Sequence, residues 1–209
     1  MLKITDLGGA IIVHTFACIF GLAVARCLYK PSRKNHKLET SNYISDTFAL
    51  IGTVFLWCYW PSFNAGPGDD SERYMAIINT YLSLCGSAVS VFFTSIAVSS
   101  ERKLTMAHVQ NATLAGGVAM AATASMPVQP FGALLIGSIA GIASVLGFKY
   151  TQVIFFKKFR VQTEFKPYFA DKFNLHDSCG VNNLHGYPSM ISMLASVFVC
   201  LTGFHSADL

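Results

Sequence analysis

Charge is scarce in this sequence. Charged residues make up 12% of the 209 residues, whereas a soluble globular domain carries roughly 25%. The few charges fall into short clusters, and the segments between them, such as 47–63 and 75–98, contain none. Hydrophobic residues make up 53% of the chain. This arrangement excludes an ordinary soluble domain and predicts an all-α membrane protein.

The motifs of enzymes and of cofactor sites are absent. The sequence has no phosphate-binding G-x-x-x-x-G-K loop, no nucleophile elbow and no pair of acids placed for hydrolysis. Its six cysteines form no C-x-x-C pair and lie mostly in apolar segments, which indicates buried free thiols. We therefore expect no enzyme activity, no cofactor and no metal site. One alternative stays open, in which His14, His108 and His185 bind a metal or haem in a membrane redox protein, although no second pair of facing histidines is evident.

Six segments are long and apolar enough to cross a bilayer, which takes about 20 helical residues. They cover about 8–28, 44–63, 75–98, 108–126, 128–148 and 180–204. The chain is thus expected to form a single membrane domain over residues 1–209. The first segment also resembles a secretory signal, because Lys3 precedes it and Ala23-Val24-Ala25 imitates a cleavage site. Its length and the preceding Asp6 favour a membrane span instead.

Basic residues alternate from side to side between these segments. Thirteen of the fifteen Lys and Arg lie in the loops after the first, third and fifth segments, and only Lys3 and Arg73 lie on the other side. Positive loops remain in the cytoplasm, so we expect a multi-pass protein of the cell membrane whose N-terminus and loop 64–73 face outward. We interpret the basic clusters as topology signals and not as a nucleic-acid site, although the loop 149–172 would also attract anionic lipid.

Two smaller patterns concern packing and the membrane interface. Gly137 and Gly141 are four residues apart, a spacing that lets membrane helices approach closely. Trp57, Tyr59 and Trp60 lie at the outer end of the second segment, where we expect an aromatic belt.

The same pattern of residues begins the first and the last segments. Residues 6–14 and 177–185 both fit D-x-x-G-x-x-x-x-H, and they start segments that run in opposite directions. Eight helical residues rise about 12 Å, so an Asp at each membrane surface would place His14 and His185 near mid-depth. Inverted repeats in transporters place the substrate site there, and ionisable residues inside a span are usually functional. We therefore interpret the two histidines as a pair that lines a pore.

Each of these residues also has a purely structural interpretation. Either histidine would then simply bond a neighbouring helix. Asp6 and Asp177 would cap the exposed amides at the start of a helix.

Longer motifs carry a family resemblance. They are Asp6-Leu7-Gly8-Gly9 through His14-Thr15-Phe16, Phe55-Leu56-Trp57-Cys58-Tyr59-Trp60-Pro61-Ser62-Phe63-Asn64, Ile78-Asn79-Thr80-Tyr81, the run from His108 to Gly117, and Cys179-Gly180-Val181-Asn182-Asn183-Leu184-His185-Gly186. Through these segments the chain resembles the Rhesus glycoprotein branch of the ammonium transporter (Amt/Mep/Rh) family over nearly its whole length. The resemblance implies a fold of about eleven or twelve spans in two inverted halves, assembled as a homotrimer with one pore per subunit. The six segments correspond to about the fifth to tenth spans of that fold, so we expect a fragment or a truncated gene product.

The resemblance also implies roles for individual residues. His14 and His185 match the twin histidines of the family's pore. Asp6 matches the acid below its recruitment site, and Asp177 matches the counterpart of that acid in the other half.

At the outer end of the pore, Phe63 matches one ring of the family's external gate and Asn64 lies beside it. Plain packing of Phe63 stays open as the alternative.

The function that the resemblance implies is an ammonia or ammonium channel. Moving bare ammonium into hydrocarbon is prohibitive, whereas neutral ammonia needs only a few hydrogen bonds, and burial disfavours charged histidine. A neutral pair of imidazoles would share one N–H···N bond and offer its remaining edge to ammonia. Methylamine and carbon dioxide are further candidate substrates. The alternative is a non-conducting Rhesus-type subunit or interaction protein, because part of the family's pore wall has no counterpart in this sequence.

Overall fold

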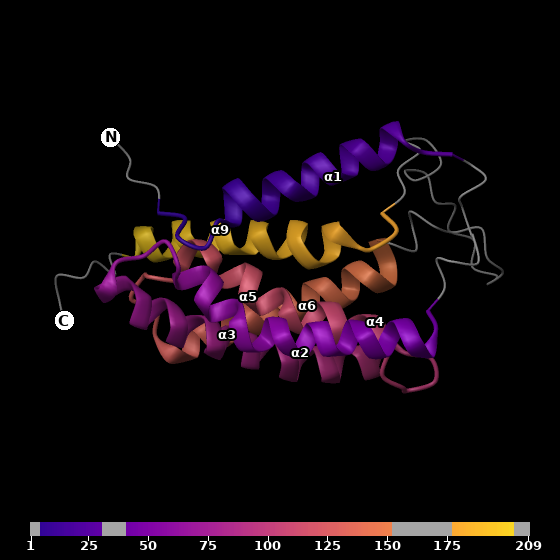
Figure 1. Ribbon diagram of the computed structural model, residues 1–209. Coiled ribbons are helices and arrows are strands. Elements are labelled where there is room, and N and C mark those ends of the chain that lie inside the picture. Colours follow the sequence, from indigo (N-terminus) through magenta and orange to yellow (C-terminus); the bar gives the residue numbers. More distant parts are fainter. Residues whose placement is uncertain (1–4, 31–40, 152–176, 203–209) are drawn as a thin grey trace.

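The computed structural model describes residues 5–30, 41–151 and 177–202, and every regular element within these ranges is helical. Elements η1, η6 and η7 are π-helical, and η4 and η5 are 3₁₀ turns. In chain order the elements are η1 (Ala10–Thr15), α1 (Phe16–Cys27), α2 (Tyr43–Ala65), α3 (Asp70–Val98), α4 (Met106–Asn111), η4 (Ala112–Leu114), α5 (Ala115–Met120), η5 (Ala121–Thr123), α6 (Pro130–Leu146), η6 (Gly147–Thr151), η7 (Asn182–Gly186) and α9 (Tyr187–Leu201). Helices α1 and α9 lie along one side of the bundle, and α2 and α3 lie along the opposite side (Figure 1).

Local sequence explains where the long helices begin. Before α3, the Asp69 carboxylate accepts hydrogen bonds from the amides of Ser71 and Glu72 at 2.9 and 3.0 Å, while Glu72 reaches back to the Asp69 amide at 3.2 Å. This reciprocal arrangement is a capping box. Asn42 caps α2 by accepting from the Ser45 amide at 3.0 Å, and Pro130 occupies the first position of α6, where its missing amide hydrogen costs nothing.

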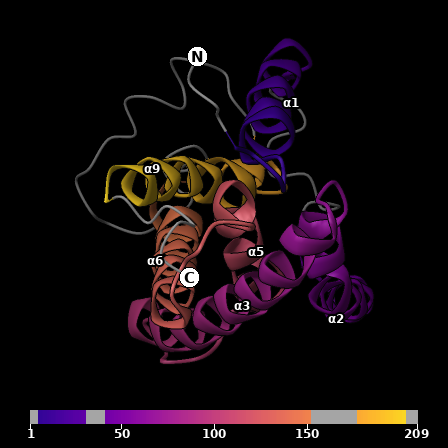
Figure 2. The ribbon, with the colours of Figure 1, turned by 90° about the vertical axis from the view of Figure 1, so that its left-hand side faces the viewer.

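The short helix α5 forms the centre of the molecule. Figure 2 shows it between α9, α6 and α3, and all six of its residues are buried. Two serines of α3 satisfy carbonyls of α5 and of the preceding turn η4, since Ser83 donates to Gly116 O at 2.7 Å and Ser87 donates to Ala112 O at 2.9 Å. Irregular backbone is tolerated inside a membrane protein only where neighbouring groups satisfy it.

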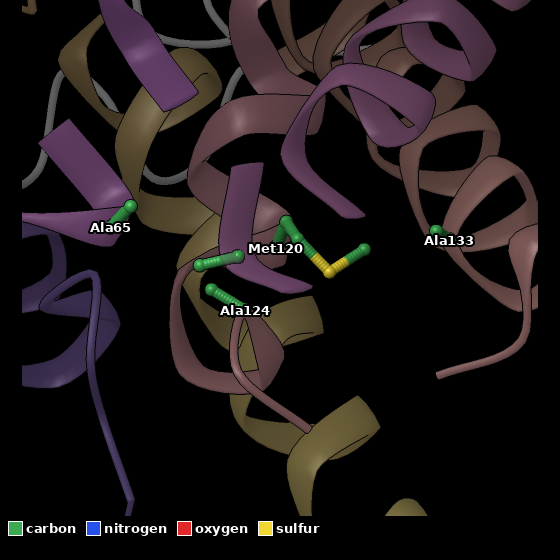
Figure 3. Close-up of a cluster of buried hydrophobic side chains, with 5 residues drawn as sticks. Ala65, Met120, Ala124 and Ala133 are labelled. Atoms are coloured by element: carbon green, nitrogen blue, oxygen red, sulfur yellow. The ribbon is translucent and has the colours of Figure 1, made fainter. Parts of the chain in front are cut away.

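The predicted close packing at the glycine pair is confirmed. A Cβ atom at Gly137 would overlap the carbonyl of Ser83, and one at Gly141 would lie 2.5 Å from Ser90 Oγ. Helices α3 and α6 therefore touch through their backbones at these positions. A cluster of buried hydrophobic side chains, four alanines and one methionine, lies at the C-terminal end of α5 (Figure 3); it consists of Ala65, Ala76, Met120, Ala124 and Ala133.

Four helical stretches of the described chain are long and apolar enough to cross a membrane. They are Ala10–Cys27, Asp70–Val98, Pro130–Thr151 and Asn182–Leu201. The predicted second segment falls on α2, a helix of 23 residues. The predicted fourth segment is divided among α4, η4, α5 and η5. At the first of these junctions Asn111 Nδ2 donates to Ala107 O at 2.9 Å, a side-chain bond to the backbone of the kind that competes with the helical ladder.

Much apolar surface of the outer helices is exposed within the chain. On α1, Phe16 is 64% and Phe20 is 60% exposed, as expected of a multi-pass membrane protein whose helices face lipid or other protein. The same exposure overturns one expectation about cysteine. All six cysteines are free thiols, but only Cys18 is buried, and the others are exposed: Cys27, Cys58, Cys85, Cys179 and Cys200. Apolar neighbours in sequence do not predict burial here because a membrane helix is apolar on its outer side too.

Candidate functional site

The two D-x-x-G sequences form the same turn. Gly9 and Gly180 adopt left-handed φ values of 74° and 73°, which glycine accepts without steric cost. In each turn the carboxylate of the preceding aspartate accepts hydrogen bonds from the first amides of the following helix. Asp6 accepts from the amides of residues 10, 11 and 12 at 2.6, 2.9 and 3.3 Å, and Asp177 accepts from those of residues 181 and 182 at 2.9 and 3.0 Å. The repeated spacing thus encodes a capped helix start.

A π-helical turn follows each capped start and contains the histidine. His14 lies in η1, where its amide donates to Gly9 O, five residues earlier, at 3.0 Å. His185 lies in η7. A π turn takes one more residue than an α turn, so it changes the direction in which the following side chains point, and such turns occur often at functional sites.

The structure brings the two histidines together. His14 Nδ1 and His185 Nδ1 are 3.1 Å apart, and the rings are stacked with centroids 5.1 Å apart and planes inclined by 15°. His14 is 5% exposed. Two residues 171 positions apart in sequence therefore form one hydrogen-bonded pair between the two helices that start with the repeated turn.

The contact between the two rings dictates how protons are arranged on them. One Nδ1 must carry the shared hydrogen and the other must accept it. In the uncharged pair, the ring that donates has a bare Nε2, and the ring that accepts carries its hydrogen on Nε2. The outer edges of the pair thus offer one hydrogen-bond acceptor and one donor, which suits a small molecule that can both donate and accept.

Two aromatic rings of α2 lie beside His14. Trp60 stacks on it with centroids 6.0 Å apart and planes inclined by 18°, and Phe63 lies 5.8 Å away, tilted by 52°. Within the described ranges, His14 Nε2 and Trp60 Nε1 are buried and lack a hydrogen-bond partner. A donor and an imidazole nitrogen are therefore both free to bind a small polar guest.

Trp60 corrects the expected aromatic belt. It is 6% exposed, and its ring stacks on His14. The helical spacing of α2 carries the signal, because Trp60, Phe63 and Asn64 are three and four residues apart and share one face.

Phe63 and Asn64 have different surroundings although they are adjacent. Phe63 is 49% exposed. Asn64 is fully buried and ties α2 to its neighbours, since its Nδ2 donates to Thr80 Oγ1 at 3.1 Å and to Gly117 O at 2.9 Å. Its Oδ1 faces Gly8, where an added Cβ would lie 2.5 Å from it. Asn64 thus supports the turn that begins with Asp6.

Both aspartates are positioned as helix caps. Asp177 is 4% exposed, and Asp6 is partly exposed. The structural interpretation of these residues therefore holds, whatever further role they have.

The metal-site alternative is not assembled by the described part of the chain, where no three His, Cys, Asp or Glu side chains gather. His108 lies apart from the histidine pair in its bonding: its Nδ1 is 2.8 Å from Ser95 Oγ. The three histidines do not converge on one ligand position.

Comparison with known proteins identifies relatives. The model of the family described as "Ammonium Transporter Family" matches residues 1–207. Ammonium transporter Rh type A of Canis lupus familiaris is 45% identical over 206 residues, which cover 98% of this chain and 46% of that protein. Ammonium transporter Rh type B of Rattus norvegicus is 42% identical over 211 residues, which cover 99% of this chain and 43% of that protein. The chain thus spans less than half the length of these curated relatives.

Two solved structures have a similar fold. Rh50 of Nitrosomonas europaea, a protein of the Rhesus family of channels, has a TM-score of 0.83 and 31% identity over 97% of this chain and 51% of its own. Mep2 of Saccharomyces cerevisiae shares the fold with a TM-score of 0.69 at 21% identity, over 92% of this chain and 38% of its own.

Proposed function

Because the chain belongs to the ammonium transporter family, we propose that it forms part of a transmembrane path for ammonia whose central section is lined by His14 and His185. One observation carries the proposal: imidazoles from two membrane helices meet at 3.1 Å, with His14 buried. The family is one of transporters and not of enzymes, so these histidines bind and pass a substrate that leaves unchanged.

The physical basis of selection is the cost of removing charge from water. Ammonium loses its hydration on entering a low-dielectric passage, and this cost is prohibitive for an unpaired ion. Neutral ammonia needs only hydrogen-bond partners. The uncharged histidine pair offers one donor and one acceptor, so ammonia passes along it after leaving a proton at the entrance.

The aromatic rings beside His14 define the outer approach to the pair. Phe63 forms an apolar constriction whose face attracts an arriving ammonium ion through its π electrons. Trp60 Nε1, buried and without a partner in the described ranges, donates a hydrogen bond to ammonia next to His14. The free energy of deprotonation is thus offset by new hydrogen bonds inside the passage.

The remaining site residues hold this geometry. Asp6 and Asp177 fix the starts of the two histidine-bearing helices through their backbone amides. Their negative charges also favour a cation near each entrance. Asn64 locks α2 against the Asp6 turn and so sets the position of Phe63.

The proposed partners follow from the family and from the exposed apolar surface. The substrate is ammonia delivered as ammonium, with methylamine and carbon dioxide as further substrates to be tested. Membrane lipid surrounds the outer helices, and the assembly is a homotrimer.

A non-conducting subunit is the second candidate. It is favoured by α1, which directly follows the turn that contains His14 and yet exposes Phe16 and Phe20. If this face of α1 stays open to lipid, the passage lacks a wall, and the chain acts by assembling with longer members of the family.

Ammonia flux into proteoliposomes tests the proposal. The chain is reconstituted alone and together with a full-length Rhesus-type protein, and the rise of internal pH after an ammonia gradient is followed by stopped-flow fluorescence. Loss of a hydrogen bond worth about 1.4 kcal/mol at the barrier lowers the rate about tenfold, and we expect a fall of that order for His14→Ala and for His185→Ala.

The matched control is Ile19→Ala, which truncates an exposed side chain of α1 and should leave the flux unchanged. Undiminished flux in both histidine variants overturns the twin-histidine mechanism. Suppression of the flux of the full-length protein by this chain, with none from the chain alone, supports the non-conducting subunit.

A further inference from the structure

An aromatic ring packs against the turn that leads to His185. Phe148, in η6, is 8% exposed, and its ring lies against Gly180. A Cβ atom at Gly180 would lie 2.8 Å from Phe148 Cζ and closer still to Cε1. The position of this glycine is therefore limited on one side by the Phe148 ring.

Gly180 is the point from which the π turn of His185 starts. Its carbonyl accepts the amides of Asn183 at 2.9 Å and Leu184 at 3.1 Å, and its own amide donates to Asp177 O at 3.4 Å. A shift of Gly180 therefore moves the bonded turn as a unit, and His185 follows Leu184 directly.

The Phe148 ring has a second neighbour, in α4. His108 of α4 lies beside Phe148, with ring centroids 6.0 Å apart and planes tilted by 50°. His108 is held by Ser95 of α3 through the 2.8 Å contact described above, and Ser95 Oγ also accepts the Thr105 amide at 3.3 Å. Ser95, His108, Phe148 and Gly180 thus form a continuous series of contacts from α3 to the histidine-bearing turn.

The first copy of the repeated motif, residues 6–14, makes different contacts. There the Gly8 amide donates to Ala121 O at 2.9 Å, and Asn64 Oδ1 lies against the same glycine. Polar and backbone contacts hold the glycine of the first turn, whereas the glycine of the second turn packs against an aromatic ring. The two histidines therefore depend on different side chains for their placement.

We propose that Phe148 is a positioning residue for His185: it sets the point at which the His185 ring meets His14, acting through Gly180 and itself held by His108. This inference rests on the proposed function, because it assigns Phe148 to the same histidine pair. Phe148 touches neither imidazole of the pair in this role, and its removal displaces one ring without altering the chemistry of either.

The test measures the histidine pair directly. Protein labelled with ¹⁵N-histidine is placed in lipid vesicles, and solid-state nuclear magnetic resonance detects the hydrogen shared between the two Nδ1 atoms. We expect Phe148→Ala to abolish this signal and Phe148→Leu, which restores apolar volume against Gly180, to recover it. Phe131→Ala on α6 is the control, because Phe131 is 74% exposed, and it should keep the signal. Persistence of the shared-hydrogen signal in Phe148→Ala overturns the inference.

A second variant covers the case in which Phe148→Ala does not fold. Ser95→Ala leaves the ring in place but releases His108, and it should weaken the shared-hydrogen signal while Phe148→Leu keeps it. An unchanged signal in Ser95→Ala, with Phe148→Ala unfolded, overturns the inference as well. Because the measurement needs no transport, absence of flux from the unmodified protein would refute the proposed function while leaving this result to stand or fall by itself.

Discussion

The hydroxyl of Thr15 donates a hydrogen bond to the hydroxyl of Ser189 across 2.8 Å. Thr15 follows His14 directly, and Ser189 lies one helical turn beyond His185. Ser189 in turn donates to Gly186 O at 2.9 Å. This contact joins the two histidine-bearing helices at the level of the imidazole pair, so the pair is part of a small polar interface and not an isolated encounter.

Removing this contact should loosen the helix pair. Ser189 is fully buried, and a net hydrogen bond contributes about 1 kcal/mol, so Thr15→Val should lower the free energy of unfolding by about that amount. Denaturant titration in mild detergent measures the change. Thr202→Val, whose hydroxyl bonds only carbonyls of its own helix on the exposed side, is the control. Equal stability of the Thr15 variant and the unmodified protein would show that the Thr15–Ser189 hydrogen bond does not stabilise the helix pair.

The two left-handed glycines should not tolerate alanine. A left-handed alanine costs about 1–2 kcal/mol, and we expect Gly9→Ala to lose this much stability. The added Cβ would also meet a side chain at both positions, Val13 Cγ2 at 2.7 Å for Gly9 and the ring of Phe148 at a shorter distance for Gly180, so Gly180→Ala should lose more. Thermal unfolding measures both. Gly21→Ala is the control, since Gly21 has no atom within 4 Å of its added Cβ and lies inside α1, where alanine favours the helix. If Gly180→Ala is no worse than Gly21→Ala, the account of this turn is wrong.

Added side-chain volume at the contact between α3 and α6 should destabilise the protein. At Gly137 a Cβ would overlap the Ser83 carbonyl, and overpacking of a filled interior costs typically about 1–3 kcal/mol. Gly137→Ala should therefore lower the unfolding temperature clearly, whereas Gly52→Ala, which meets nothing within 4 Å, should not. A similar result for both variants would argue against backbone contact between these helices.

Acid should weaken the start of α3 through Asp69. The hydrogen bond from the Ser71 hydroxyl, followed by that from the Glu72 amide, lowers the pKa of Asp69 from its ordinary value of 3.8. A carboxyl whose folded pKa is depressed stabilises the folded state above its unfolded value, and this contribution is lost as the pH falls through the folded pKa. Asp69→Asn keeps a cap without the titrating group, so its unfolding temperature should fall less between neutral pH and pH below 3.8 than that of the unmodified protein. Identical slopes would show that the cap does not titrate.

The sequence predicts the histidine pair because the signal is local and occurs twice. The aspartate, the glycine and the histidine of each motif lie close together in sequence, so their spacing carries the capping geometry and places His14 and His185 in the turn that follows each cap. The aromatic surroundings escaped prediction for a different reason. Position along a span suggests an interface belt for Trp60, whereas its helical face determines that it contacts His14.

Other features depend on contacts that no local pattern encodes. The break of the fourth segment at Asn111 leaves its apolar composition unchanged, so a search for long apolar runs sees one span. Phe148 and Gly180 are far apart in sequence, and neither residue type alone indicates that one rests on the other. Exposure of the cysteines likewise depends on which side of each helix faces outward.

The central claim is that His14 and His185 act as one unit in a path for ammonia. The most direct measurement is ammonia flux in proteoliposomes containing His14→Ala, His185→Ala and the double variant, at equal protein content. Because residues that act together are strongly non-additive, the account predicts that the double variant loses no more flux than either single variant. Single losses that multiply in the double variant, or single variants with undiminished flux, would contradict it.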